Sequence, residues 1–502
     1  MWNRGLMAHL TRRRFAECIT GSLAAARLFA IAPRPKLFVL LLAEQFRSDY
    51  LGRFAGLFAP GGFRRLMEEG SYLPDCRMAA SSFSASGLET IVTGAYPQSH
   101  GIVAETWYDA ESTEIVTASP SEIQAGTLAD EIALADSRNR VFGMDLNGSR
   151  ASLLARHATH KVLALDRFIA GEPEWAESFR QSHSPERFKN AKWQALQTDP
   201  NAPPLRVLVD DPARPEDFMA LYNASPFAQE TQFEFLRTAI AEEKLGQGAA
   251  FDFVTVVLSS MALLGYEVGA DSPLMREMVL HLDRQIELTL EALKKLPGFG
   301  LAFCAAHGAP NHDGRRVNGA AVAQAIDKAL SDAHDVSVAK NRYVERYVYP
   351  FVYLNHRQLR RYGVDVRAAR RMAGEAALRS APGVAGYYTA DGDCSISGGW
   401  LRRFQNSFND VRSGDLMLAY EPNAVEEYGD GRGISYGSLY NYDVQTPLLF
   451  YGSQFAARTV ERPVELVDIA PTLARALRVA APSSSMGRVL GEVFAPDKKG
   501  EK

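Results

Sequence analysis

Cysteine is scarce in this chain, and the few copies present lie far apart. Only four occur among 502 residues, and no two of them form a Cys-x-x-Cys pair. This spacing excludes a disulfide framework and a cysteine-based zinc centre. The four are Cys18, Cys76, Cys304 and Cys394.

Strong charge of one sign and long apolar runs are also missing. The formal net charge is −4, which offers no argument for binding nucleic acid or anionic membranes. Beyond the N-terminal region, no apolar run approaches the roughly 20 residues of a membrane-spanning helix. The apolar fraction of 46% and the charged fraction of 23% are typical of a soluble globular protein. We therefore expect no nucleic-acid partner and no transmembrane span.

The N-terminal residues 1–32 have the layout of an export signal. A basic cluster, Arg12 to Arg14, precedes a small and mostly apolar run that ends near Ala-Ile-Ala-Pro. This order is typical of secretory signals, and Thr11 to Phe15 resembles a twin-arginine signal. The alternative is a basic leader with no targeting role. The sequence thus predicts export, which makes the protein periplasmic or secreted.

Short apolar runs alternate with amphipathic helical patterns along the rest of the chain. Continuous apolar runs of this length are typical of strands buried on both faces of a parallel sheet. Helices between such strands favour an α/β fold. The predicted strands lie within 36–46, 139–146, 251–260, 300–308 and 446–455, and the longest predicted helix covers 272–296.

Two regions interrupt this alternation. Residues from about 166 to 226 are richer in proline, tryptophan and polar residues, and we predict that they form an insertion over the sheet. Residues from about 343 to 422 contain strand-like stretches, including 347–355, around a helical one, which predicts a small inserted α+β unit. The main domain is predicted to cover 36–494, followed by a tail at 495–502.

Several motifs, in this order, resemble the alkaline-phosphatase superfamily. They include EQFRSDYLGRF from residue 44, ETIVTGAYPQSHGIVAETWYD from residue 89, LSSMALLGYEVGADSP from residue 258 and AAHGAP from residue 305. The ordered set is most similar to phosphate monoesterases related to type I phosphodiesterases and nucleotide pyrophosphatases. The resemblance implies an α/β fold with a central mixed, mostly parallel sheet between helices and with cap segments inserted near the cleft.

The resemblance also implies a two-zinc site, which most of the matching positions do not supply. In the family, Asp and His ligands hold two zinc ions that activate the nucleophile and stabilise the leaving oxygen. Glu44 takes the place of one Asp ligand, His307 matches a His ligand, and Ser84 stands at the nucleophile position. The remaining ligand positions carry neutral residues, namely Ala262, Tyr266, Ala306 and Tyr436.

Positions on the substrate side of the family's cleft differ as well. Glu105 stands where the monoesterases carry an Asn. Asn147 and Ser149 stand where they carry a Lys and an Arg, and Arg150 follows one position later. A carboxylate beside a phosphate dianion is repulsive unless a metal or an arginine lies between them. Glu105, Asn147 and Ser149 are the candidate substrate-binding residues.

We therefore expect a catalytically degenerate family member that keeps a cleft for a small ligand or a protein partner. No cofactor is expected, or at most a single weakly bound zinc. One alternative is a phosphate mono- or diester hydrolase with a reduced single-metal site on Glu44, Ser84 and His307. Another is a metal-independent serine esterase in which His307 or His157 activates Ser84.

Overall fold

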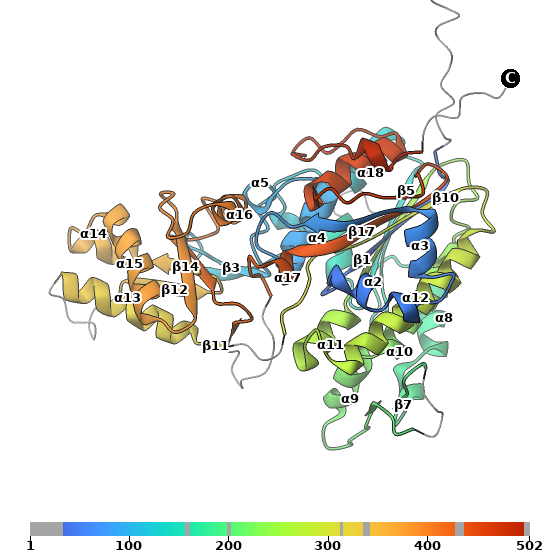
Figure 1. The fold of residues 1–502 in the computed structure, drawn as a ribbon, viewed down its shortest axis with the longest axis horizontal. Helices are drawn as coiled ribbons and strands as arrows, with labels where there is room; N and C mark the ends of the chain where they lie inside the picture. The colour runs from blue at the N-terminus through green and yellow to red at the C-terminus, as the bar shows by residue number, and fades with distance from the viewer. Residues whose placement is uncertain are drawn as a thin grey trace, which may run out of the picture.

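A computed structural model describes residues 34–155, 161–197, 202–311, 315–334, 342–426 and 436–495. The predicted export signal, His157 and nearly all of the predicted tail lie outside these ranges. Within them, nine strands form the main sheet, in the order β18-β2-β17-β10-β1-β9-β5-β6, with β19 pairing with β2. Figure 1 shows this sheet between two layers of helices, with a smaller unit of strands and helices at one end.

The main sheet is mixed and mostly parallel, which confirms the predicted fold class. Strand β1 (Leu37–Ala43) pairs in parallel with β9 (Asp252–Leu258) and β10 (Phe299–Ala305), and the next strands β5 and β6 continue in parallel. Only β17 runs against its neighbours β10 and β2. The remaining bounds are β2 Ser71–Arg77, β5 Arg140–Asp145, β6 Lys161–Ala164, β17 Gln445–Gly452, β18 Arg458–Thr459 and β19 Val464–Glu465.

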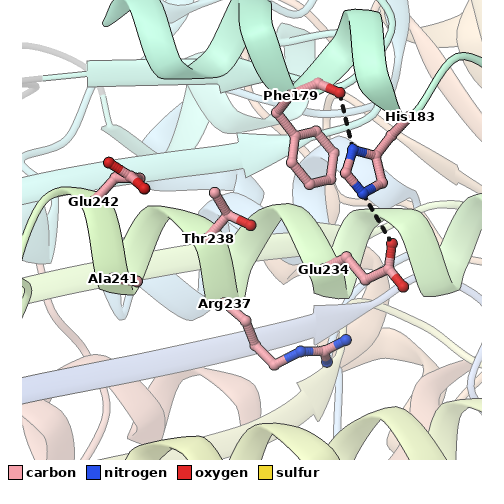
Figure 2. Close-up of a pocket in the computed structure, with 7 residues that line it drawn as sticks. All are labelled: Phe179, His183, Glu234, Arg237, Thr238, Ala241 and Glu242. Atoms are coloured by element: carbon pink, nitrogen blue, oxygen red, sulfur yellow. Dashed lines mark hydrogen bonds and ion pairs between the residues drawn. The ribbon is translucent and has the colours of Figure 1, made fainter.

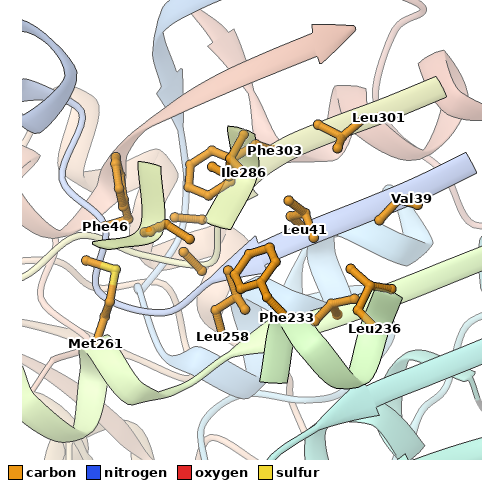
Figure 3. Close-up of a cluster of buried hydrophobic side chains, with 14 of the residues drawn as sticks. Val39, Leu41, Phe46, Phe233, Leu236, Leu258, Met261, Ile286, Leu301 and Phe303 are labelled. Carbon is orange, nitrogen blue, oxygen red and sulfur yellow. The ribbon is translucent and has the colours of Figure 1, made fainter. Parts of the chain in front are cut away.

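Strand β1 is fully buried because helices cover both faces of the sheet. Its odd-numbered side chains, such as Val39 and Leu41, join one apolar cluster (Figure 3), and Phe38, Leu40 and Leu42 join the cluster on the other face. This follows from the period of two along a strand. The first cluster is covered by α2 Asp49–Arg53, α3 Phe63–Glu69, α8 Glu174–Ser182, α10 Pro226–Glu242, α11 Ser260–Val268 and α12 Pro273–Leu293. The second is covered by α4 Ser84–Thr93, α6 Leu128–Ala135, α7 Ser149–Ala155 and α18 Ile469–Leu477.

The smaller unit is a four-stranded antiparallel sheet with helices on one face. Its strands follow the order β12-β13-β15-β14. Side chains of one face pack with the helices, while Phe351 and Met417 on the other face pack with Phe83 and Trp107, beside the start of α4. The bounds are β12 Val344–Val348, β13 Phe351–Leu354, β14 Val384–Thr389, β15 Leu416–Tyr420, α13 Gly319–Ala333, α14 His356–Arg361 and α15 Val366–Ser380. The unit therefore lies directly over the N-terminus of α4.

One local expectation about this unit is confirmed in part. Residues 347–355 are predicted to be strand-like, and the structure has the end of β12 and all of β13 there, joined by a turn at Tyr349 and Pro350 that was not predicted. The physical reason is that proline has no N–H to donate within a strand ladder. The apolar pattern continues through the turn because both strands of the hairpin belong to the same small sheet.

The described part of the segment from 166 to 226 lies below the main sheet in Figure 1 and consists mostly of turns and irregular chain between short elements. It holds α8, the two-residue strands β7 (Lys192–Trp193) and β8 (Arg206–Val207), and α9 (Pro215–Asn223). Among the residues that the structure describes, no helix is both long enough and apolar enough to cross a membrane.

Candidate active-site cleft

The candidate site lies where three neighbouring strands end. Glu44 directly follows β1, Ser259 directly follows β9, and His307 comes two residues after β10. Because these strands are parallel neighbours, their carboxyl ends meet at one edge of the sheet, which is the usual ligand edge of open α/β folds. Ser84, the first residue of α4, contacts this edge from the next layer.

Three of the predicted site residues form one hydrogen-bonded group. The Ser84 hydroxyl donates to Oε1 of Glu44, and His307 Nε2 lies 3.3 Å from Ser84 Oγ. The exposed fractions are 1% for Ser84, 3% for Glu44 and 0% for His307. The structure thus brings the predicted nucleophile and the two predicted remnant ligands together, in a place that solvent scarcely reaches.

His307 is held as a neutral imidazole. Its Nδ1–H donates to the carbonyl oxygen of Gly308 at 2.7 Å, which leaves Nε2 with its lone pair toward Ser84. Burial lowers the pKa of His307, although Glu44 acts in the opposite direction. Residue 308 has no room for a side chain, because an added Cβ would lie 2.0 Å from the carbonyl oxygen of Tyr442.

At two positions predicted to have lost ligands, Tyr436 stacks on His307 and Tyr266 stacks on Tyr436. The ring centroids of Tyr436 and His307 lie 4.5 Å apart with the planes at 11°, and the ring centroids of Tyr266 and Tyr436 lie 5.5 Å apart. Burial raises the pKa of both tyrosines, so the phenols are neutral, and a hydrogen bond joins their side chains. Aromatic volume therefore occupies the space beside the histidine.

The two alanines of the predicted ligand set are also buried. Ala262 is 3% exposed and lies one turn before Tyr266 on α11. Ala306 is fully buried, and its carbonyl oxygen faces Gly87 of α4, where an added Cβ would come within 2.4 Å of it. Helix α4 can approach the end of β10 this closely because residue 87 is glycine.

Arg150 forms ion pairs with both Glu44 and Glu105. Its guanidinium lies 3.5 Å from Glu44 Oε1 through Nε and 2.6 Å from Glu105 Oε2 through Nη2. Burial alone would raise the pKa of Glu44, but the charge of Arg150 and hydrogen bonds from Ser259 and Ser84 outweigh it and hold that pKa below its usual value. Glu44 is therefore a carboxylate at neutral pH.

The other two substrate-side candidates do not join this network. Asn147 and Ser149 are exposed, and the Asn147 side chain accepts from the Ser149 N–H at 3.0 Å and from its hydroxyl at 2.6 Å. These contacts fix the turn that leads into α7. Sequence reasoning placed Arg150 one position away from an expected arginine and assigned it no role, and only the fold shows which carboxylates it meets.

As arranged, these side chains do not form a zinc site. In the part of the chain that the structure describes, no three His, Cys, Asp or Glu side chains gather where they could hold a metal ion. The Glu44 carboxylate is already engaged by Ser84, Ser259 and Arg150. Tyr266, Tyr436, Ala262 and Ala306 offer no carboxylate, imidazole or thiolate donor.

A separate pocket of about 380 Å³ lies between α8 and α10 (Figure 2). The His183 ring stacks on Phe179 at 3.9 Å, and its Nε2 lies 3.6 Å from Glu234 Oε2. The lining residues are Phe179, His183, Glu234, Arg237, Thr238, Ala241 and Glu242. None of them belongs to the cleft around Ser84, and their mutual contacts join the two helices.

Comparisons with known proteins agree with this architecture. The alkaline phosphatase PafA of Elizabethkingia meningoseptica is 25% identical, in an alignment covering 95% of this chain and 97% of that protein. The alkaline phosphatase PhoV of Synechococcus elongatus is also 25% identical, covering 92% and 93%. The crystal structure of wild-type PafA superposes with a TM-score of 0.80 at 23% identity, over 92% of this chain and 100% of that one. The family model for type I phosphodiesterase / nucleotide pyrophosphatase matches residues 38–438, so this chain belongs to that family.

Proposed function

We propose that this chain is a family member that does not hydrolyse phosphate esters, and that its closed cleft serves to bind a small ligand or a protein partner. The observation that carries the proposal is the ion-paired group around Ser84. Ser84 contacts both Glu44 and His307, and Arg150 contacts Glu44, so that the Glu44 carboxylate is already engaged by protein groups.

The state of the Ser84 hydroxyl supports this proposal. Attack on phosphorus needs a deprotonated or metal-activated oxygen in line with the leaving group. Here the hydroxyl proton is directed to Glu44, and the residue is 1% exposed.

The charges of the cleft also oppose a phosphate ester. Among the residues that the structure describes, Arg150 is the only cation that forms an ion pair with Glu44 or Glu105, and it pairs with both. Two carboxylates and one guanidinium sum to a negative charge. A phosphate dianion would therefore meet net repulsion where a phosphatase needs attraction.

Metal content and turnover test the proposal together. The purified chain should hold well under one zinc per molecule after mild dialysis, and turnover of an aryl phosphate should stay at the background rate with and without added zinc. A sample incubated with excess zinc before the same dialysis controls for loss of metal during preparation. Two tightly held zinc ions with substantial turnover would refute the proposal, and one bound zinc with turnover would support the single-metal alternative on Glu44, Ser84 and His307.

A metal-independent esterase is the second candidate, and the Ser84–His307 contact favours it. His307 Nε2 lies 3.3 Å from Ser84 Oγ, so the imidazole would be placed to act as the base once the hydroxyl turns from Glu44 toward it. The test is labelling by a fluorophosphonate probe and turnover of an aryl acetate, compared between the native chain and Ser84→Ala. Stoichiometric labelling that Ser84→Ala abolishes would establish this candidate.

A further inference from the structure

We propose that the outer end of the smaller unit, formed by α14 and the residues beside it, is a docking surface for an anionic lipid bilayer. This surface, termed the arginine face, consists of the exposed side chains of Arg342, Arg357, Arg360, Arg361 and Tyr362. It lies at the end of the molecule that is remote from the main sheet (Figure 1). The proposal does not depend on whether the cleft around Ser84 is catalytic.

Positive charge is concentrated here in a chain whose formal net charge is −4. Residues 356–371 contain six arginines and a single acidic residue, Asp365. The Asp365 side chain caps the N-terminus of α15, where it accepts from the N–H of Ala368 at 2.8 Å. A local excess of this kind attracts an anionic surface even though the chain as a whole is acidic.

The neighbouring helix α15 shows what the arginine face lacks. On α15, Arg370 Nε lies 2.7 Å from Asp415 Oδ1, and Arg367 Nη2 lies 3.6 Å from Asp393 Oδ1. By contrast, none of the four arginines of the arginine face forms an ion pair with any residue that the structure describes. The fold therefore pairs these two charges of α15 with carboxylates and leaves those of the arginine face to an outside partner.

Helix α14 directs its arginines outward because its apolar side is anchored. Leu359 is fully buried in the apolar cluster of the smaller unit. At about 100° per residue, Arg357 and Arg361 lie opposite Leu359 and one turn apart. The helix is fixed at both ends, since the Asn355 side chain accepts a backbone N–H of the first turn at 3.0 Å and Gly363 follows with a φ of 62°.

The arginine face continues across Tyr362 to the start of β12. The Arg361 guanidinium lies 5.6 Å from the centre of the Tyr362 ring, and Tyr362 is 36% exposed. The Tyr343 ring lies 6.3 Å from the Tyr362 ring, and Arg342 directly precedes Tyr343. Arginines in the last turn of a helix also stabilise its carbonyl end. That effect does not account for Arg342 or Arg357, which lie outside the last turn.

A lipid bilayer fits this surface better than nucleic acid does. Clusters of at least four Lys or Arg residues are attracted to anionic lipid headgroups. The ring of an exposed tyrosine among them favours the membrane–water interface. Export of the chain, which residues 1–32 predict, would also separate it from the nucleic acid of the cell.

Vesicle binding by the full chain tests the proposal. The native chain should sediment with vesicles that contain about 30% phosphatidylglycerol, but not with vesicles of phosphatidylcholine alone, and about 0.5 M salt should release it. Each arginine near an anionic surface strengthens binding about fivefold. Replacing Arg357, Arg360 and Arg361 together by glutamine should therefore weaken binding about a hundredfold, and replacing all three by lysine should preserve it.

A control variant removes the same amount of charge elsewhere. It carries Arg138→Gln, Arg214→Gln and Arg462→Gln, whose native side chains are 74%, 65% and 62% exposed. Because all the substituted side chains are exposed, every variant should unfold near the native midpoint. The control should bind anionic vesicles within about twofold of the native chain.

Several outcomes would overturn the proposal. If both glutamine variants lost affinity equally, net charge and not the arginine face would explain the binding. A native chain that ignores anionic vesicles, or that binds neutral ones as tightly, would also overturn it. A DNA duplex of about 20 base pairs should bind more weakly than anionic vesicles do. A duplex that binds more tightly, and that loses affinity through the same three substitutions on α14, would assign the surface to nucleic acid instead.

Discussion

Restoring the family's ligands should make this fold depend on metal. The change combines Glu44→Asp, Ala262→Asp, Tyr266→His, Ala306→Asp and Tyr436→His. Ala306 is fully buried and Ala262 is 3% exposed, so each new carboxylate enters a site without a cation of its own. An uncompensated buried charge costs about 3–5 kcal/mol. The pair therefore costs about 6–10 kcal/mol, comparable with the 5–15 kcal/mol that stabilises a typical native protein.

Zinc should reverse much of this loss. Ligand present at about a thousandfold over its dissociation constant stabilises the native state by about 4 kcal/mol per site. Urea unfolding of the restored variant in EDTA and in excess zinc measures the difference directly. The control carries the same three aspartates with Tyr266→Gln and Tyr436→Gln, which supply no imidazole and should bind zinc far more weakly.

Phosphatase activity should remain low even when zinc binds. Glu105 and Asn147 would still face the substrate, and the loss of one well-placed charge-stabilising group costs about a hundredfold or more in rate. Adding Glu105→Asn and Asn147→Lys should then raise aryl phosphate turnover. A restored variant that binds no zinc while folding as stably as the native chain would refute the reasoning, since the five positions would then not share one metal site.

Four further outcomes are expected. Gly87→Ala should lower the free energy of unfolding by about 1–3 kcal/mol in urea titrations, because the new Cβ would lie 2.4 Å from the Ala306 carbonyl oxygen. Ser84→Ala should destabilise by about 1–3 kcal/mol, since Glu44 loses a hydrogen-bond donor; an unchanged midpoint would contradict this. Burial raises the pKa of Asp443 from 3.8 to about 7, so the protonated acid favours folding, and its contribution is lost as pH rises from about 4 to 7. Asp443→Asn should reduce the fall in the free energy of unfolding between pH 4 and 8 by at most about 4 kcal/mol. The same pH dependence of that free energy in the variant and in the native chain would contradict this. Residues 1–32 fused to a reporter should direct export to the periplasm, and retention of the fusion in the cytoplasm would exclude a signal.

Local pattern was enough to predict five strands of the main sheet, namely β1, β5, β9, β10 and β17, but not its other four strands or the details of the smaller unit. The apolar run of β1 predicts burial on both faces, and the structure places alternate side chains of this strand in two clusters. The turn between β12 and β13 was not predicted because the residues before and after it are equally apolar. Both strands belong to the same small sheet, so the apolar pattern does not change at the turn. Short strands such as β18 and β19, of two residues each, carry no pattern at all.

The candidate site was likewise predicted only in part. Glu44, Ser84 and His307 were predicted through ordered motifs, and the fold brings their polar atoms into contact. The role of Arg150 could not be predicted, because its two partners come from segments about 45 and 105 residues away in the sequence. Such an ion pair forms only when β1, α4 and α7 pack together, and no spacing of residues along the sequence predicts it.

Because Glu105 forms a hydrogen bond with the first turn of α4, the chain itself competes with free anions for the N-terminus of this helix. Oε1 of Glu105 accepts from the N–H of Ala85 at 2.9 Å, in the first turn of the helix, while Oε2 meets Arg150. Helix N-termini attract anions, and here the anion belongs to the same chain. A tethered group acts at an effective concentration in the millimolar range or above. A free phosphate must therefore displace Glu105 before it reaches these donors.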